Sequence, residues 1–362
     1  EGIDVFLGHA RFTGADTVEV NGTTLRFARC CVATGARPAL PPIPGLAEAE
    51  PLTNETLFTL TEAPQRLLIL GAGVIGCEMA QAFRGFGTEV VLVDQSDRVL
   101  AREDAEAAAQ LQQTLEREGV ELRLGTGIRE VQRVDGRARV VLEDGSILEG
   151  DALLAALGRS PNVDLDLDAA GVTHTRKGVQ VDDFLRTSNP RIYAAGDVIG
   201  KVQLTHAADH QARIVVQNAL FFGRRRASAL VLPRVVYTAP EVASVGLSAD
   251  EADADPSLTP FTTALSETDR GRTDGVEGFL RVWADGSGRI RGASAVGPGA
   301  GELLAPVTLA MTHGIKLSQV ASTVHAYPTL SEAFFKVASA YNRTRLTGWM
   351  QRLLRWVLSW RR

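Results

Sequence analysis

The segment His325-Ala-Tyr-Pro-Thr-Leu-Ser-Glu332 contains residue types that could perform acid–base chemistry. A histidine with a pKa of about 6.5 takes up and returns a proton at neutral pH, whereas a phenol with a pKa of about 10 is a poor base. Tyr327 is therefore not expected to abstract protons. The other candidate base is His325. It lies about 6–7 Å from Tyr327 along an extended segment, with its side chain on the same face.

The stretch Gly71-Ala-Gly73-Val-Ile-Gly76 has the spacing of a phosphate-binding loop, and it follows an apolar strand and opens a helix. Gly71 permits the tight turn, Gly73 lets the backbone approach a pyrophosphate, and Gly76 lets helix and sheet pack closely. The helix N-terminus offers N–H groups and a partial positive charge to the phosphates. This context favours a dinucleotide site over a glycine-rich turn of another doubly wound fold.

Asp94 lies 18 residues past Gly76, at the end of the next apolar strand. A carboxylate there accepts hydrogen bonds from the adenosine ribose diol, and its charge repels a 2′-phosphate. The sequence therefore predicts NAD rather than NADP, although the nearby Arg98 keeps NADP open.

The bulk composition excludes several classes of protein. A chain of 362 residues predicts two or three domains. A net charge of −5 gives no general attraction to nucleic acid. The sequence contains no run of 18 apolar residues, so it predicts no membrane-spanning helix. The sequence has no signal peptide, and because it begins at Glu1 and not at Met, we expect a fragment of a longer protein.

The three cysteines are too few for a disulfide scaffold and indicate a reducing, cytoplasmic setting. Cys30 and Cys31, in FARCCVATG, are expected in the core of a buried strand, with a redox or metal pair as the alternative. Cys77 is expected to fill the contact between helix and sheet. No cysteine or histidine spacing typical of a metal site occurs, so none is predicted.

Three successive patterns describe the elements that must position these residues. Residues 1–36 contain short strands with a hairpin at Asn21-Gly22. From Gln65 the order strand, helix, strand indicates a parallel sheet, and a helix is expected from about residue 207 to 222. From Val231 the pattern indicates an α+β domain.

Six segments then carry a family resemblance, in order: VATGARP (from Val32), LLILGAGVIGCEMA, LLAALGRSPN, TSNPRIYAAGD, YTAPEVASVGL and HAYPTLSE. Together they resemble the flavin-dependent pyridine nucleotide–disulfide oxidoreductases, in the branch of dihydrolipoamide dehydrogenase, glutathione reductase and mercuric reductase. The resemblance covers nearly the whole chain. It implies an α/β fold that forms a homodimer, with these parts: a remnant of the FAD-binding domain (1–64), an NAD(P)-binding Rossmann-like domain (65–149), the return of the FAD-binding domain (150–226), an α+β dimerisation domain (227–342) and a C-terminal helix (343–362).

The resemblance also implies roles for single residues. Gly71, Gly73, Gly76 and Asp94 would hold NAD, and Glu78 would lie near its nicotinamide end. Residues near FAD would be Thr34, Gly35, Gly158, Gly196, Asp197 and His206. Without the other motifs, Asp197 is equally well explained as a turn residue or a helix cap.

Two motifs of this family are not in the sequence: a first GxGxxG for the ADP half of FAD, and a CxxxxC redox disulfide. Both would lie upstream of Glu1, where the size of a flavin-binding half-domain predicts about a hundred more residues. We therefore expect the chain as given to bind FAD poorly and not to be a competent reductase.

In the disulfide reductases that HAYPTLSE resembles, the residue before Pro-Thr is a histidine oriented by a glutamate. Glu332 is kept here, but Tyr327 occupies the histidine position, which disfavours acid–base reduction of a disulfide. Tyrosine at this place resembles mercuric reductase, although the vicinal cysteine pair near its C-terminus is missing. The alternative is that Tyr327 and His325 pack at a dimer interface.

The tail Arg343–Arg362 predicts a basic amphipathic helix. One face carries apolar residues and the other polar ones; the apolar set is Leu346, Trp349, Met350, Leu353, Val357 and Trp360. Tryptophans with arginines suit a membrane surface. We favour a terminal helix that packs on its own dimer, with peripheral membrane contact as the alternative.

Three functions follow. The leading one is a FAD-dependent NAD(P)H oxidoreductase that passes electrons through flavin and a cysteine pair to a thiol-bound acceptor or mercuric ion. The second is an NADH oxidase or quinone reductase of the same fold. The third is a non-catalytic nucleotide-binding and dimerisation module.

Overall fold

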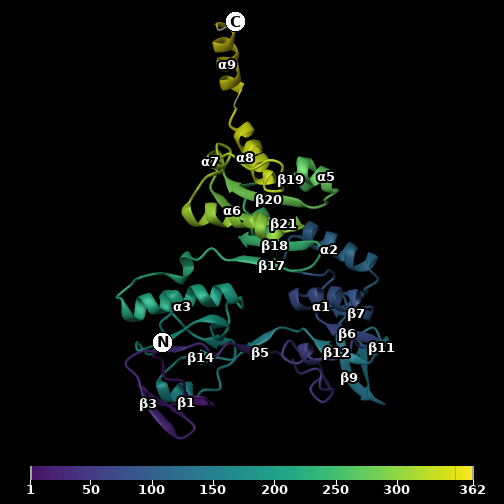
Figure 1. Cartoon of the computed structure of the whole chain (residues 1–362), viewed down its shortest axis with the longest axis vertical. Helices are drawn as coiled ribbons and strands as arrows, with labels where there is room; N and C mark the ends of the chain where they lie inside the picture. The colour runs from purple at the N-terminus through teal and green to yellow at the C-terminus, as the bar shows by residue number, and fades with distance from the viewer. Residues whose placement is uncertain (1, 347, 361–362) are drawn as a thin grey trace. The chain divides into compact units, whose positions relative to one another are not determined.

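A computed structural model describes residues 2–346 and 348–360. The chain divides into two compact units, and each is described by itself (Figure 1). Unit 1 comprises Glu1–Pro41 and Leu157–Leu230, and unit 2 comprises Pro42–Ala156 and Val231–Arg362. Each unit is therefore built from two stretches that are far apart in the sequence.

Unit 1 consists of short strands and one long helix. Its elements are β1 (Ala10–Gly14), β2 (Thr17–Val20), β3 (Thr23–Arg26), β4 (Cys30–Val32), β5 (Ala36–Pro38), β13 (Arg159–Pro161), η2 (Leu167–Ala170), β14 (His174–Thr175), β15 (Gly178–Val179), β16 (Ile192–Ala194), η3 (Gly196–Ile199), α3 (Thr205–Leu220) and η4 (Ala227–Ala229). Strands β1, β2 and β3 form a meander, and Asn21 and Gly22 have positive φ at its predicted turn. Strand β16 pairs in parallel with β4, and β13 pairs with β5, so the two stretches of unit 1 are joined by backbone ladders.

The burial of the two cysteines of β4 differs from the sequence prediction. Cys30 is partly buried in the core of unit 1, but Cys31 is exposed. Successive side chains of a strand point to opposite faces, so Cys31 faces away from the side on which Cys30 and the buried Val32 lie. The expectation of two core cysteines is therefore wrong for Cys31.

The first half of unit 2 is a parallel sheet with the strand order β12-β6-β7-β8. Its elements are η1 (Leu57–Thr59), β6 (Arg66–Leu70), α1 (Val74–Gly85), β7 (Glu89–Asp94), α2 (Ala105–Arg117), β8 (Glu121–Leu124) and β12 (Ala152–Ala155). The centres of β6 and β7 are fully buried, which explains their continuous apolar runs. Strands β9 (Ile128–Val134), β10 (Arg137–Leu142) and β11 (Ile147–Gly150) form an antiparallel sheet with turns at Asp135-Gly136 and Asp144-Gly145.

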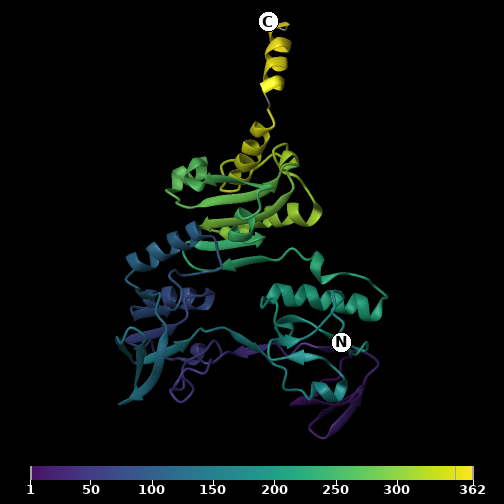
Figure 2. The same cartoon turned by 180° about the vertical axis from the view of Figure 1, so that it is seen from behind.

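The second half of unit 2 is a mixed α+β domain around an antiparallel sheet with the order β17-β18-β21-β20-β19 (Figures 1 and 2). Its elements are β17 (Pro233–Val236), β18 (Glu241–Gly246), α4 (Ala249–Asp253), β19 (Leu258–Ala264), η5 (Leu265–Glu267), α5 (Asp269–Asp274), β20 (Phe279–Asp285), β21 (Ile290–Gly297), α6 (Ala300–His313), α7 (Leu317–Val320), α8 (Glu332–Thr344) and α9 (Gly348–Trp360).

The two faces of this sheet contribute to different cores. Ala243 and Val245 of β18 pack into the cluster that α6 and α8 complete. Val242 of the same strand packs with the core of the parallel sheet. The period of two along β18 thus places the strand between both cores of unit 2.

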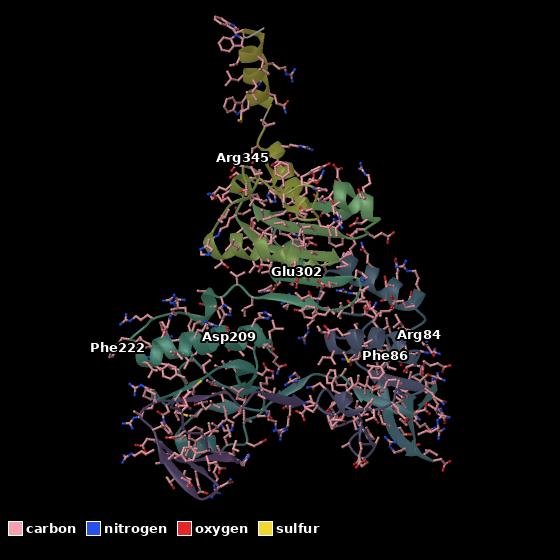
Figure 3. All side chains as sticks on the ribbon, viewed as in Figure 1. Arg84, Phe86, Asp209, Phe222, Glu302 and Arg345 are labelled. Carbon is pink, nitrogen blue, oxygen red and sulfur yellow. The ribbon has the colours of Figure 1, made fainter. Side chains whose placement is uncertain are left out.

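The predicted tail helix is divided in the structure. Residues 343 and 344 complete α8, Arg345 (labelled in Figure 3) caps it, and α9 begins at Gly348. Thr347, Arg361 and Arg362 lie outside the described residues. In residues 2–346 and 348–360 no helix is long and apolar enough to cross a membrane.

An ion pair joins α2 to β20. The Arg281 guanidinium donates to the carboxylates of Asp104, at 2.8 Å, and of Glu106. Asp104 is also the N-cap of α2, because its other oxygen accepts from the N–H groups of Glu106 and Ala107. The side chains of Arg281 and Asp104 are only 19% and 2% exposed, so water screens this pair weakly.

We predict that Arg281→Met lowers the free energy of unfolding by about 3 kcal/mol, because it leaves the buried Asp104 carboxylate without its cation. The matched control is Arg270→Met, which breaks the exposed ion pair with Asp274 and should cost less than about 1 kcal/mol. Urea denaturation of the three proteins checks this through the midpoint. Equal midpoints for the two variants would contradict it.

Candidate functional site

The glycine loop connects β6 to α1 and has the geometry of a phosphate cradle. Gly71 has a φ of +104°, which favours glycine. A Cβ at Gly76 would lie 1.8 Å from the carbonyl oxygen of Gly71, so only glycine fits there. At Gly73, the N-cap of α1, a Cβ would meet no atom within 4 Å. The first turn of α1 therefore presents its N–H groups to an open space beside Gly73, which fits a pyrophosphate.

Asp94 fastens this loop at the end of β7. One carboxylate oxygen accepts from the Ala72 N–H at 2.7 Å and the other from the Ser96 N–H at 2.7 Å. Each oxygen keeps a further lone pair for a ribose hydroxyl. The Arg98 guanidinium donates instead to the backbone carbonyls of Glu103, at 3.0 Å, and Ala101, at 2.9 Å. These two bonds hold Arg98 in place.

Glu78, on the first turns of α1, bonds to the segment between β17 and β18. Its carboxylate accepts from the Tyr237 N–H at 2.8 Å. Burial raises the pKa of Glu78, and this hydrogen bond partly opposes the rise. One turn further along α1, Gln81 bonds to both the N–H and the carbonyl of Ala239. Helix α1, which follows the glycine loop, is thus anchored to the part of unit 2 that contains the antiparallel sheet of β17 to β21.

In unit 1, Thr34 and Gly35 are held by Asn162 of the segment LLAALGRSPN. The Thr34 hydroxyl donates to the Asn162 carbonyl at 2.8 Å, and the Asn162 amide returns a bond of 2.9 Å to the Thr34 carbonyl. Gly35 and Gly158 have φ values of +69° and +109°, and a Cβ at either would meet open space. The two predicted flavin-contacting segments are therefore side by side, with open glycine positions that a bound group could approach.

Gly196 and Asp197 begin η3, directly after β16. The Gly196 N–H donates to the buried amide oxygen of Gln211 at 2.7 Å. The Asp197 carboxylate lies 3.3 Å from the guanidinium of Arg159 on β13. Arg159 adjoins Gly158, so this ion pair brings the AAGD and LLAALGRSPN segments together within unit 1. His206 lies on the first turn of α3, where its carbonyl is bonded by the ring of His210.

Tyr327 lies between α7 and α8, exposed and hydrogen-bonded to a residue that the sequence did not indicate. Its hydroxyl donates to the carboxylate of Asp269, on α5, at 2.6 Å. The Asp269 hydrogen bond and charge raise the pKa of Tyr327 above its ordinary value, and Glu332 adds to the rise. Tyr327 therefore keeps its proton at neutral pH, as its residue type predicted.

His325 and Glu332 are placed differently from Tyr327. The His325 ring packs against Phe334 and Phe335, with centroid distances of 6.5 Å and 5.8 Å. One Glu332 oxygen lies 3.2 Å from the ammonium of Lys336. The His325 Nε2 and the other Glu332 oxygen are buried and have no hydrogen-bond partner within the described part of the chain. The two groups thus retain unused bonding capacity.

The cysteine thiols have no sign of activation. Burial raises the pKa of Cys30 to about 11 and that of Cys77 to about 12. The Cys77 thiol donates to the Ala72 carbonyl at 3.3 Å inside the contact between helix and sheet. Among the described residues, no group of three or more His, Cys, Asp or Glu side chains is arranged to hold a metal ion.

Two successive parts of the chain match a known family and its dimerisation domain. Residues 1–212 match the family described as pyridine nucleotide-disulphide oxidoreductase, and residues 232–338 match the dimerisation domain of that family. The mercuric reductase of Lysinibacillus sphaericus is 34% identical over 351 residues, which cover 94% of this chain and 64% of that protein. The dihydrolipoyl dehydrogenase of Thermus scotoductus is 35% identical over 353 residues, covering 94% and 76%. The chain thus spans less than two thirds of the length of this mercuric reductase.

A solved structure agrees with the fold. The HOCl-induced flavoprotein disulfide reductase RclA from Escherichia coli matches with a TM-score of 0.84 and 28% identity, over 92% of this chain and 78% of that chain. RclA has also been solved as a Cu(II) complex. The α/β architecture and the dimerisation domain expected from the sequence are confirmed by these matches.

We predict that Gly73→Ala weakens NADH binding by about tenfold or more, because the added methyl group would occupy the space beside the α1 N-terminus. Its matched control is Gly85→Ala, the same change at the other end of α1, where a Cβ also meets open space. Isothermal titration calorimetry gives the dissociation constants. Wild-type affinity in Gly73→Ala would show that nothing binds at this loop.

Proposed function

Because the chain belongs to the pyridine nucleotide-disulphide oxidoreductase family, we propose that it forms part of a cytoplasmic, FAD-dependent enzyme that oxidises NAD(P)H. Members of this family use FAD and NAD(P)H. When bound, the flavin supplies two-electron transfer between the nicotinamide and an acceptor. The open space at Gly73 supports NAD(P)H binding, and the paired segments around Gly35 and Gly158 support flavin binding.

In this proposal the residues of unit 2 bind and orient the nicotinamide nucleotide. The α1 N-terminus and Gly73 receive the pyrophosphate, and Asp94 accepts from the ribose diol. Glu78 lies on the side of α1 that meets Tyr237, and we assign it to the nicotinamide end. In unit 1, Asp197 and the neighbouring Gly196 are assigned to the flavin, together with Thr34 and His206.

We propose a mercuric-reductase-like enzyme, in which electrons pass through a cysteine pair to a thiol-bound acceptor or to mercuric ion. The observation that carries this proposal is the Tyr327 phenol, exposed and held protonated by Asp269 at the place of the expected base. A phenol with a raised pKa is a poor proton carrier, but its oxygen can accept a hydrogen bond or contact a cation. That the relative RclA has been solved as a Cu(II) complex supports a metal ion among the candidate acceptors.

The same contacts suit two other functions. An NADH oxidase or quinone reductase of this fold would need the nucleotide site and the flavin, but no cysteine pair. A non-catalytic nucleotide-binding and dimerisation module would need only the glycine loop and the dimerisation domain. The two enzyme proposals therefore differ in what accepts electrons from the flavin, and the non-catalytic module transfers none.

We further propose that the chain works as a homodimer through residues 232–338. Val324 is 95% exposed in the segment before α8, where an apolar side chain would otherwise face water. A second copy that covers this residue would remove its side chain from water.

The test of the enzyme proposal is a visible absorption spectrum of the protein expressed from its natural reading frame, before and after anaerobic NADH. We expect a flavin spectrum that gains a long-wavelength band, which reports a thiolate beside the flavin. A flavin that only bleaches would favour the oxidase or quinone reductase. A colourless protein would leave the nucleotide-binding module.

We propose in addition that α9 makes peripheral contact with a membrane surface. None of its residues is buried, unlike those of α8. At about 3.6 residues per turn, its apolar residues occupy more than half of the circumference. Residues 343–362 contain six arginines and no acidic residue, in a chain with a net charge of −5. The arginines would be attracted to either anionic surface, and the tryptophans suit the membrane surface.

We predict that the chain co-sediments with phosphatidylcholine vesicles that contain phosphatidylserine, and that the double change Arg352→Glu with Arg355→Glu weakens this binding by tenfold or more, at about 1 kcal/mol per arginine. The matched control changes two exposed arginines of unit 1, Arg224 and Arg225, to glutamate. Equal loss in both variants, or no binding by the wild type, would refute the membrane contact and leave packing on a second copy.

A further inference from the structure

The hydrogen bond between Tyr327 and Asp269 joins residues that are 58 positions apart. At 2.6 Å it is short, as expected for a hydroxyl that donates to a carboxylate. The phenol has one proton, and this bond uses it. The lone pairs of the Tyr327 oxygen therefore remain available on an exposed side chain.

Asp269 is held in place by the start of α5. The side chain of the preceding residue, Thr268, is buried, accepts from the Gly271 N–H at 3.0 Å and donates to the Leu265 carbonyl at 2.7 Å. The Asp269 carbonyl accepts from the Thr273 hydroxyl at 2.8 Å. These bonds fix the backbone from which the carboxylate reaches Tyr327.

Two cations near this pair are bound to other carboxylates. Arg270, next to Asp269, is paired with Asp274, and Lys336 is paired with Glu332. No salt bridge of the described residues includes Asp269, so its charge is not neutralised by a neighbouring cation. Glu332 adds a second carboxylate whose charge acts on the phenol. An acceptor that approaches Tyr327 thus meets a phenol oxygen with free lone pairs beside an unpaired anion.

We infer that Asp269 positions Tyr327, and that the two residues together favour a cationic electron acceptor over an anionic one. This inference rests on the proposed function for the identity of the site, but the contact between the two residues can be measured without turnover. Asp269 holds the phenol proton and fixes the direction of its lone pairs. Its charge attracts a cation and repels carboxylate-bearing disulfides.

The first experiment is an ultraviolet titration of phenolate formation in the 362-residue chain. The difference between the wild type and Tyr327→Phe isolates Tyr327 from the other three tyrosines. We expect Asp269→Asn to lower the pKa of Tyr327 toward its ordinary value of about 10, because the anion that opposes ionisation is gone. The matched control is Asp274→Asn, a carboxylate on the same helix that is paired with Arg270. Circular dichroism verifies that each variant is folded over the range.

The second experiment uses the protein from the natural reading frame and mercuric ion presented as its complexes with two small thiols of opposite charge, cysteamine and thioglycolate. We expect Asp269→Asn to lower kcat/KM for the cationic complex relative to the anionic one by about fivefold or more, since two unit charges a few ångströms apart in water interact by about 1 kcal/mol. Asp274→Asn should leave this ratio unchanged.

The outcomes distinguish the positioning role of Asp269 from the preference for a cationic acceptor. An unchanged Tyr327 titration in Asp269→Asn, or an equal shift in Asp274→Asn, would overturn the positioning role. A shifted titration with an unchanged ratio of kcat/KM would overturn the preference for a cation. Absence of NADH-dependent turnover with every acceptor would count against the proposed function, while the titration would still decide the role of Asp269.

Discussion

The close approach of α1 to the end of β6 is the constraint on which the candidate nucleotide site depends. The carbonyl oxygen of Gly71 occupies the space that any larger residue at position 76 would need. Because glycine stands there, the first turn of α1 lies directly against the loop, and its N–H groups converge beside Gly73. Asp94 then ties Ala72 to the neighbouring strand, and this bond fixes the form of the loop. The site is in this sense preorganised for a phosphate group.

The same helix is hydrogen-bonded to the dimerisation domain of unit 2. Glu78 and Gln81 lie on one face of α1 and bond to the segment that links β17 to β18. At α2, Asp104 serves two purposes, since one oxygen caps the helix and the other receives Arg281. Polar bonds at helix ends thus reinforce the apolar core that Val242 and Phe279 share with the parallel sheet. Removal of either kind of contact would weaken the attachment of the antiparallel sheet to the helices beside the candidate nucleotide site.

The parts that the sequence predicted are those determined by local chemistry. The glycine loop, the turn at Asn21-Gly22 and the period of the apolar strands all depend on residues that are close along the chain. The bond between Tyr327 and Asp269 was not predicted, because it joins segments 58 residues apart and depends on how α5 packs. The two bonds of Arg98 to carbonyl groups were missed for a different reason. They depend on a side-chain conformation, whereas the sequence showed only that Arg98 lies near Asp94, where it could meet a 2′-phosphate. The exposure of Cys31 depends on which face of β4 is covered, which no local pattern records.

The chemistry of Tyr327 follows from the sign of its pKa shift. A neighbouring carboxylate stabilises the neutral phenol, so the proton stays bound throughout the neutral range and beyond the ordinary pKa. A histidine at this position would change its charge near neutral pH and could carry a proton to a leaving thiolate. Tyrosine with Asp269 has lost that ability and has gained a fixed neutral oxygen beside a permanent negative charge. In the proposed function, Tyr327 therefore serves recognition and not proton transfer, and we expect an acceptor that needs no proton from the protein, such as a metal cation, to suit this site better than a disulfide.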